Sequence, residues 1–235
     1  MHKIIVEDIV VHVKRKNIRH MYLSLQPPDG RVRISTPKDI DDETVRSFVV
    51  SKLPWIKRHL ERFKKKKPLS PQKYVSGEGH YFKGKRYVLN VIYQSPPSPN
   101  QVKIRSEKYL DLCVRKGSRR EQRKRVLTEW YRVRLKEMIP DLIEKWEKKI
   151  GVKVHDWGVK RMKTKWGSCN ITAKRVWVNL ELAKRPALCL EYILVHELVH
   201  FLEPHHNQKF SSYMDQFLPA WKSLNEELNK YPIRH

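Results

Sequence analysis

The sequence predicts an α+β protein, and three observations carry that prediction. Period-two alternation with β-branched residues, typical of strands, fills much of residues 9–35 and 80–115. Two longer segments, 41–65 and 118–150, repeat their apolar residues at helical spacing. The remaining block mixes short strands with one strongly apolar helix. We expect a β-rich basic region with one long helix over residues 1–116 and a second region over residues 117–235, packed together as one unit.

The N-terminal region begins with strand patterns at residues 9–13, 21–25 and 31–35. The turn signal Pro27-Pro28-Asp29-Gly30 separates the last two and predicts a hairpin. A helical pattern then begins at Asp41, and Pro54 inside it predicts either a kink or two short helices. The lysine run at residues 64–67 suits a solvated helix end, with a nucleic-acid patch as the alternative.

Strand patterns return at residues 81–82, 86–92, 102–104 and 110–114. Ser118 and Glu121 have the spacing of a capping box, so a long amphipathic helix should begin there. Pro140 predicts a bend or a second helix, and Gly151 is well placed to end it. Further strands are expected at residues 159–162, 166–169 and 176–180.

The charge of the chain is strongly basic, with 50 Lys and Arg against 25 Asp and Glu. Both halves are basic, so no tail carries the excess. Such a surface attracts polyanions, and nucleic acid is therefore a possible partner. Three scattered cysteines exclude a disulfide framework. The N-terminus lacks the features of a signal peptide, and no apolar stretch approaches the roughly 20 residues of a membrane helix. We expect a soluble cytoplasmic protein.

The segment His196-Glu197-Leu198-Val199-His200 is an HExxH motif inside an apolar helical pattern. Two histidines four residues apart project from one face of a helix, so both imidazoles can bind one metal ion. Glu197 lies beside them and can accept a proton from the attacking water. The alternative is a buried helix without a metal, which would leave three polar side chains unpartnered at a cost of several kcal/mol. We therefore predict one catalytic zinc ion, bound by His196 and His200.

A catalytic zinc site needs a third protein ligand. The spacing HExxHxxxxxH selects His206, while His205 and Glu203 are the alternatives. A chain reversal after Pro204 can bring either histidine back over the metal.

The motif set resembles a known family. Lys165-Trp166-Gly167-Ser168-Cys169, the HExxH helix and the later His206-Asn207 are similar to those of the YgjP-like zinc metallopeptidases, which are related to SprT-like proteases. The resemblance covers most of the chain and implies a zincin-like catalytic region. It also implies His196, His200 and His206 as metal ligands and Glu197 as general base. His205 departs from the family pattern, which usually has Asn directly before the last histidine.

The resemblance further implies a substrate cleft bordered by the strand ahead of the active-site helix, where peptides pair by strand addition. Trp166 and Gly167 either line that cleft or serve ordinary packing. The candidates for stabilising the transition state are His205, Tyr213 and Arg161. Asp215 or Asn179 would orient a ligand imidazole. Cys169 is expected to be a buried structural thiol, with metal ligation as the alternative, and Met214 to belong to the core.

Three functions follow from these features. The first is a zinc-dependent metallopeptidase, acting through water activated by Glu197 on acidic or nucleic-acid-associated proteins. The second is a metal-dependent nucleoside triphosphate pyrophosphatase, an activity assigned to proteins that resemble this family; no Walker-type loop supports it. The third is a nucleic-acid-binding module with a structural metal, for which Glu197 would have no use.

Overall fold

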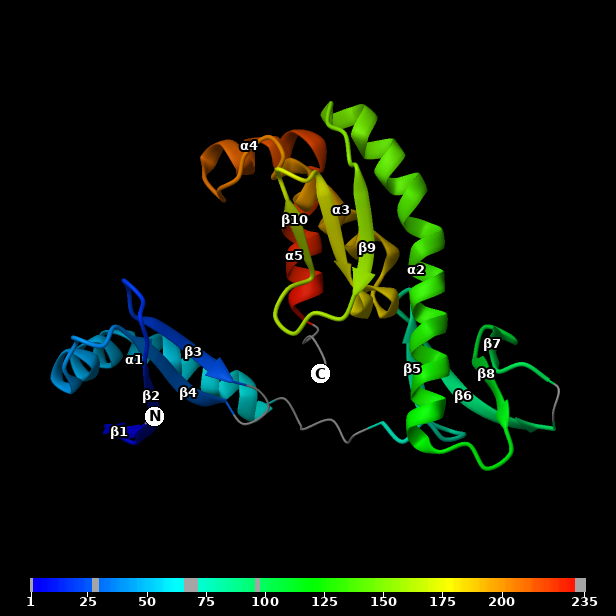
Figure 1. Ribbon diagram of the computed structural model, residues 1–235, viewed down its shortest axis with the longest axis horizontal. Coiled ribbons are helices and arrows are strands. Elements are labelled where there is room, and N and C mark those ends of the chain that lie inside the picture. The colour runs from blue at the N-terminus through cyan, green and yellow to red at the C-terminus, as the bar shows by residue number, and fades with distance from the viewer. Residues whose placement is uncertain (1, 27–29, 66–71, 96–97, 231–235) are drawn as a thin grey trace. The chain divides into compact units, whose positions relative to one another are not determined.

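The chain divides into two compact units, Met1–Pro71 and Gln72–His235. The computed structural model in Figure 1 describes residues 2–26, 30–65, 72–95 and 98–230. The division lies after Pro71, and not at the residue 116 expected from the sequence. The reason is that the strands of residues 79–115 contribute to the larger hydrophobic core of the second unit, which a strand pattern alone does not reveal.

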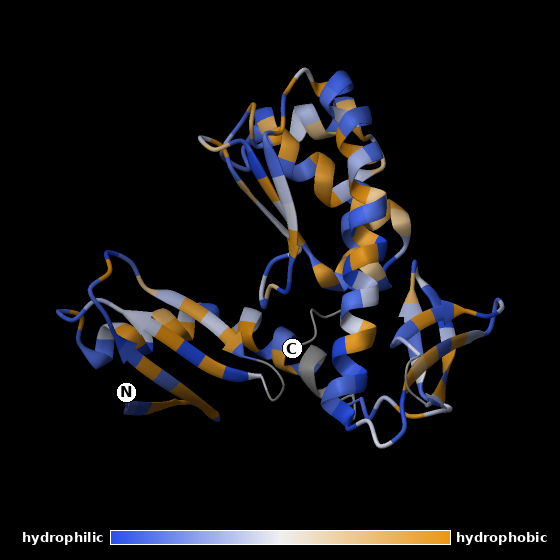
Figure 2. Cartoon of the chain, turned by 45° about the vertical axis from the view of Figure 1, so that its right-hand side comes forward, coloured by the Kyte–Doolittle hydropathy of each residue, from blue (hydrophilic) through white to orange (hydrophobic). Residues whose placement is uncertain are grey.

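The N-terminal unit is a four-stranded sheet with one helix on it. The strands are β1 (His2–Val6), β2 (Ile9–Arg15), β3 (Tyr22–Gln26) and β4 (Arg31–Thr36), in the order β1-β2-β4-β3. Strands β2 and β4 are parallel, while β3 and β4 form the predicted antiparallel hairpin, whose turn residues 27–29 lie outside the described ranges. Strand β1 was not anticipated. Figure 2 shows the alternating hydropathy along these strands.

Helix α1 (Asp42–Lys65) covers one face of this sheet and buries Val45, Val49 and Ile56 against it. It runs through Pro54 as a single helix, so the two-helix alternative is wrong. Apolar contacts on both sides of the proline hold the helix in one piece, although an internal proline typically costs about 3 kcal/mol. The side chains of the lysine run at residues 64–67 lie outside the described part of the chain.

The second unit begins with another four-stranded sheet, β5 (Gly79–Phe82), β6 (Lys85–Gln94), β7 (Gln101–Ile104) and β8 (Tyr109–Arg115), in the order β5-β6-β8-β7. The long helix α2 (Arg120–Ile150) follows it. Its N-cap is Arg119, whose backbone N–H donates to Gln122 Oε1 at 2.7 Å, so the predicted Ser118–Glu121 cap is wrong by one residue. The helix continues through Pro140 and ends at Gly151, whose φ of 75° is left-handed as predicted.

The third sheet consists of β9 (Asp156–Lys160), β10 (Gly167–Asn170) and β11 (Arg175–Asn179), in the order β10-β11-β9. Strand β11 is antiparallel to β10 and parallel to β9. A short 3₁₀ helix, η1 (Leu180–Lys184), leads to α3 (Ala187–Val199), which carries the HExxH motif. Two helices that the sequence analysis did not predict, α4 (Gln208–Phe217) and α5 (Trp221–Asn229), complete the unit.

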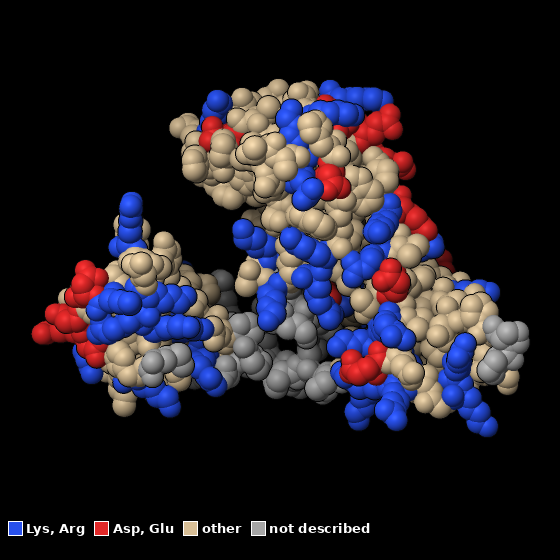
Figure 3. Space-filling model, in the orientation of Figure 1, with Lys and Arg blue, Asp and Glu red and all other residues tan. Residues whose placement is uncertain are grey.

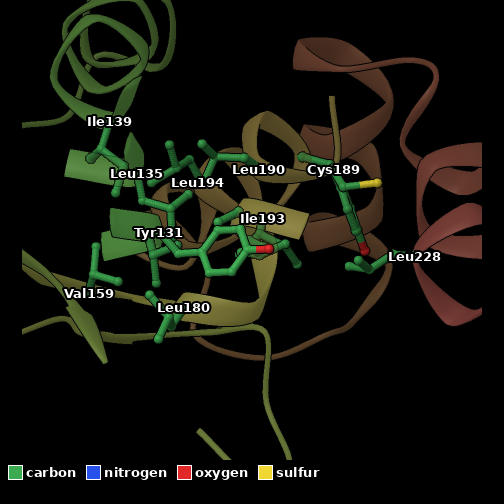
Figure 4. Close-up of a cluster of buried hydrophobic side chains, with 14 of the residues drawn as sticks. Tyr131, Leu135, Ile139, Val159, Leu180, Cys189, Leu190, Ile193, Leu194 and Leu228 are labelled. Atoms are coloured by element: carbon green, nitrogen blue, oxygen red, sulfur yellow. The ribbon is translucent and has the colours of Figure 1, made fainter. Parts of the chain in front are cut away.

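Helix α3 is buried between α2, the third sheet and the C-terminal helices. Figure 4 shows Leu135 and Ile139 of α2 near Leu190 and Leu194 of α3. A polar contact fixes the same pair of helices, because the carboxylate of Glu191 accepts from the indole N–H of Trp146 at 2.9 Å and from Lys145 at 2.6 Å. The apolar packing thus determines where the histidines of α3 point.

In the described ranges, no helix combines the length and the apolarity needed to cross a bilayer. The three cysteines, Cys113, Cys169 and Cys189, are free thiols.

Candidate metal centre and catalytic site

Three histidines converge at the C-terminal end of α3. The ring nitrogens of His196, His200 and His206 all lie within 4.8 Å of one another. His196 is half-buried in the last turn of the helix, His200 is its buried C-cap, and His206 is exposed on the following turn. Neither His205 nor Glu203 belongs to this cluster.

Local structure after α3 selects His206 over His205. The Asn207 side chain caps α4 by accepting from the backbone N–H of Phe210 at 3.0 Å, so the new helix begins directly after His206. This turns His206 back over α3 and brings its Nε2 within 3.0 Å of His196 Nε2. His205 is exposed, and its backbone N–H donates to Glu203 Oε1 at 3.1 Å.

Phe210 forms an aromatic floor under the cluster, a role that sequence reasoning missed. Its ring centroid lies 5.0, 4.7 and 4.7 Å from those of His196, His200 and His206. The signal was present as a large apolar residue four positions after His206, on the inward face of α4. Such a buried ring limits the rotamers of all three imidazoles.

The histidine cluster is suited to a zinc ion. Burial lowers the pKa of His196 to about 3 and lowers that of His200, so both rings are neutral and have a lone pair to offer. The backbone carbonyl of Glu203, 3.1 Å from His200 Nδ1, accepts a hydrogen bond from the N–H at that position, which leaves Nε2 with the lone pair that a metal ion would bind. Nitrogen ligands of a tetrahedral zinc lie roughly 3.4 Å apart, near the separation of the two Nε2 atoms above.

Glu197 is buried beside this cluster, with 6% of its surface exposed. Burial raises the pKa of its carboxyl to about 7. Two effects oppose that rise: hydrogen bonds from the thiol and the backbone N–H of Cys169, and the positive charge of Lys165. A carboxyl with such a pKa exchanges protons readily near neutrality. Sequence reasoning assigned Cys169 only a packing or ligand role and missed its contact with Glu197. Burial raises the pKa of the Cys169 thiol to about 12, so it stays protonated and acts as a donor.

Gly167 makes the closest backbone approach to Glu197. A Cβ at this position would lie 2.5 Å from Glu197 Oε1 and 2.7 Å from Ile193 Cγ2. Glycine is therefore required for β10 to pass directly over the carboxylate. The close backbone approach that the sequence offered as one explanation of Gly167 is thus present, while its place in a substrate cleft stays a prediction.

Trp166 and Arg161 lie along the chain ahead of β10 and have other partners. Trp166 packs against the core with the Arg185 guanidinium 5.5 Å from its ring. Arg161 is paired at 3.2 Å with Glu181, a fully buried carboxylate that also contacts Lys184 at 2.7 Å. Sequence reasoning missed this buried ion pair.

The Tyr213 ring stacks on Phe217 along α4, with the ring centroids 6.1 Å apart. Met214 belongs to the core, as predicted. Asp215 accepts from the Trp221 indole at 2.8 Å, so the expectation that it orients a ligand imidazole is wrong.

Asn179 does not orient an imidazole either. Its side-chain amide donates to the carbonyl oxygens of Met162 and Lys165, at 3.0 and 2.7 Å, and so fixes the loop ahead of β10. The group that orients His200 is the backbone carbonyl of Glu203, and no pattern of residue types predicts such a contact.

Two solved structures are similar to part of this chain. Abylysin, a metallopeptidase zymogen of Pyrococcus abyssi, has 17% identity and a TM-score of 0.36, covering 38% of this chain and 90% of that one. Jannalysin, a metallopeptidase zymogen of Methanocaldococcus jannaschii, has 20% identity and a TM-score of 0.36, covering 39% and 94%. At these values the two likenesses carry no inference about activity. No curated protein matches the chain.

A family model described as "YgjP-like, metallopeptidase domain" matches residues 21–231, nearly the whole chain. The resemblance drawn from the sequence motifs is thereby confirmed. The chain belongs to the YgjP-like metallopeptidase domain family, and it is therefore a hydrolase.

Proposed function

We propose that this protein is a zinc-dependent peptidase in which His196, His200 and His206 hold the ion and Glu197 is the general base. The observation that carries the proposal is the convergence of three histidine ring nitrogens next to a buried carboxylate. A purely structural zinc site would be closed by a fourth protein ligand and would have no need of that carboxylate.

A zinc ion bound here lowers the pKa of water and polarises the scissile carbonyl. The residues of the chain do the rest. Glu197 takes the proton of the attacking water and transfers it to the leaving amine. Cys169 and the close backbone of Gly167 hold the carboxylate in one position. Phe210 keeps the imidazoles in place.

Strand β10 is the proposed docking edge for the substrate. It lies at the end of its sheet and pairs with β11 along one side only. An extended peptide can add to its other side by backbone hydrogen bonds, which suits many sequences. Because Gly167 of this strand touches Glu197, a peptide paired there would pass the general base.

The proposed substrates are acidic or nucleic-acid-associated proteins, because a net charge of +25 favours polyanionic material. We place the protein in the cytoplasm, where its three free cysteines would stay reduced.

The test compares four purified proteins: wild type, Glu197→Ala, His206→Ala and His205→Ala. We expect about one zinc per chain in the wild type, in Glu197→Ala and in His205→Ala, and a large loss of zinc in His206→Ala. Casein cleavage should disappear in Glu197→Ala and on treatment with a chelator, and should return when zinc is added back to the wild type. Full cleavage by Glu197→Ala would refute the role of this residue. Release of pyrophosphate and nucleoside monophosphate from nucleoside triphosphates, without casein cleavage, would favour the pyrophosphatase.

A further inference from the structure

The N-terminal sheet has one face covered by α1 and one open face. Strand alternation puts Lys3, His12, Lys14, Tyr22, Arg31 and Arg33 on the open face, while the alternate positions, among them Ile4, Val11, Val13, Val32 and Ile34, point into the core. None of the four strands contains Asp or Glu. Figure 3 shows Lys and Arg gathered over the side of this unit on which Figure 1 shows β3 and β4.

The strand register concentrates these charges in adjacent rows. Lys3 lies opposite His12, and His12 lies opposite Arg33 on the next strand. In the neighbouring row Ser35 separates Lys14 from Tyr22. Lys14 and Arg33 lie on neighbouring strands, two positions out of direct register, so these like charges share the open face without stabilising one another.

The nearby carboxylates are used elsewhere. Glu7 pairs with Lys57 of α1 at 2.7 Å, and Asp42 pairs with Arg15 and His2. In the described part of the chain, Lys3, Lys14 and Arg33 form no ion pair within 4.0 Å. These cations are therefore available to an external anion.

An exposed ring lies among the cations. Tyr22 is 59% exposed, and the apolar side chains of Ile5 and Val10 are also exposed on this face. A flat surface with cations and an unpacked aromatic ring suits single-stranded nucleic acid, because the phosphates meet the cations and a base can stack on the ring. An acidic peptide would use the charges but would leave the ring without a partner.

We propose that the open face of the N-terminal sheet binds single-stranded nucleic acid with little sequence preference, through Lys3, Lys14 and Arg33 on the phosphates and Tyr22 on a base. This surface belongs to the unit Met1–Pro71, whereas the residues of the proposed peptidase site belong to the unit Gln72–His235. It gives the hydrolase a way to act on proteins that are associated with nucleic acid.

The experiment measures the affinity of the full-length protein for a fluorescent 20-nucleotide single strand by anisotropy, over a series of salt concentrations. Lys14→Gln/Arg33→Gln should weaken binding roughly tenfold and reduce the magnitude of the salt slope by about 1.4, since each phosphate contact on a single strand contributes about 0.7. Tyr22→Ala should weaken binding at least about fivefold, while Tyr22→Phe retains the stacking and the affinity.

The matched control is Lys52→Gln/Arg58→Gln, which removes the same charge from exposed positions of α1. It should leave the affinity within about twofold of the wild type. Equal weakening by the two double variants would show an effect of net charge alone and overturn the proposal. Unchanged binding by Tyr22→Ala, or equal binding of an acidic polypeptide, would also overturn it. Thermal melts verify that each variant is folded. If Arg33 proves necessary for folding, the double variant Lys3→Gln/Lys14→Gln replaces the first one, because it changes only exposed side chains.

Discussion

Replacing Gly167 by alanine tests how closely the position of the general base is controlled. The new Cβ would lie 2.5 Å from Glu197 Oε1, 2.8 Å from its Cγ and 2.7 Å from Ile193 Cγ2. Ordinary contact begins at 3.4 Å, so all three contacts must lengthen, the one to Glu197 Oε1 by nearly 1 Å. Ile193 and Glu197 are equally buried, with 6% of each exposed, so the new Cβ displaces the carboxylate together with Ile193 or the strand itself.

A displacement of about 1 Å in a catalytic group costs on the order of 100-fold in rate. We expect kcat for casein peptides to fall about that much in Gly167→Ala, with KM and zinc content close to those of the wild type. Overpacking should also lower stability by about 1–3 kcal/mol. Steady-state kinetics, metal analysis and urea unfolding measure the three quantities.

The control is Gly158→Ala on β9 of the same sheet, where the new Cβ would lie 2.4 Å from the Trp177 ring. It imposes comparable crowding at a position where the nearest atoms belong to Trp177 and not to Glu197. We expect it to lose stability and retain kcat. The reasoning fails if the two variants lose kcat equally, or if Gly167→Ala retains full activity.

Three further results are expected. Glu181→Ala should lower stability by about 3 kcal/mol at pH 7, because it leaves two cations beside an empty buried site. Burial alone would raise the pKa of Glu181, but Lys184 and Arg161 hold it below its usual 4.5. The contribution of Glu181 to the free energy of unfolding is therefore complete above pH 4.5 and is lost as the pH falls through the folded-state pKa. The stabilities of wild type and variant, measured by urea unfolding, should converge in acid. Phe210→Ala should cost about 3–5 kcal/mol and weaken zinc binding, measured by unfolding and by competition with a chelator; undiminished zinc affinity would contradict its role as a floor. Cys169→Ser, which retains a donor to Glu197, should keep more casein cleavage than Cys169→Ala, and equal rates would exclude the thiol from positioning the carboxylate.

The sequence predicts the regular elements well where the pattern is long. The strands of the β3–β4 hairpin, α1, α2 and the Gly151 stop all follow from local periodicity and local turn chemistry. Helices α4 and α5 were missed because ten and nine residues make fewer than three turns, too few for a helical period to be distinct, and strand β1 was missed because its sequence HKIIV does not alternate cleanly. The continuity of α1 through Pro54 required knowledge of the sheet on which it packs.

At the site, the sequence by itself determined that His196, Glu197 and His200 lie together, because helical spacing is a local geometric property. It left His206 and His205 both open, and only the folded turn separates them, since the Asn207 cap of α4 directs one ring inward and leaves the other in solvent. The contacts of Gly167 and Cys169 with Glu197 join segments about 30 residues apart. Such contacts, like the division of the chain at Pro71, depend on which apolar faces pack against each other, and no pattern within a single segment specifies that.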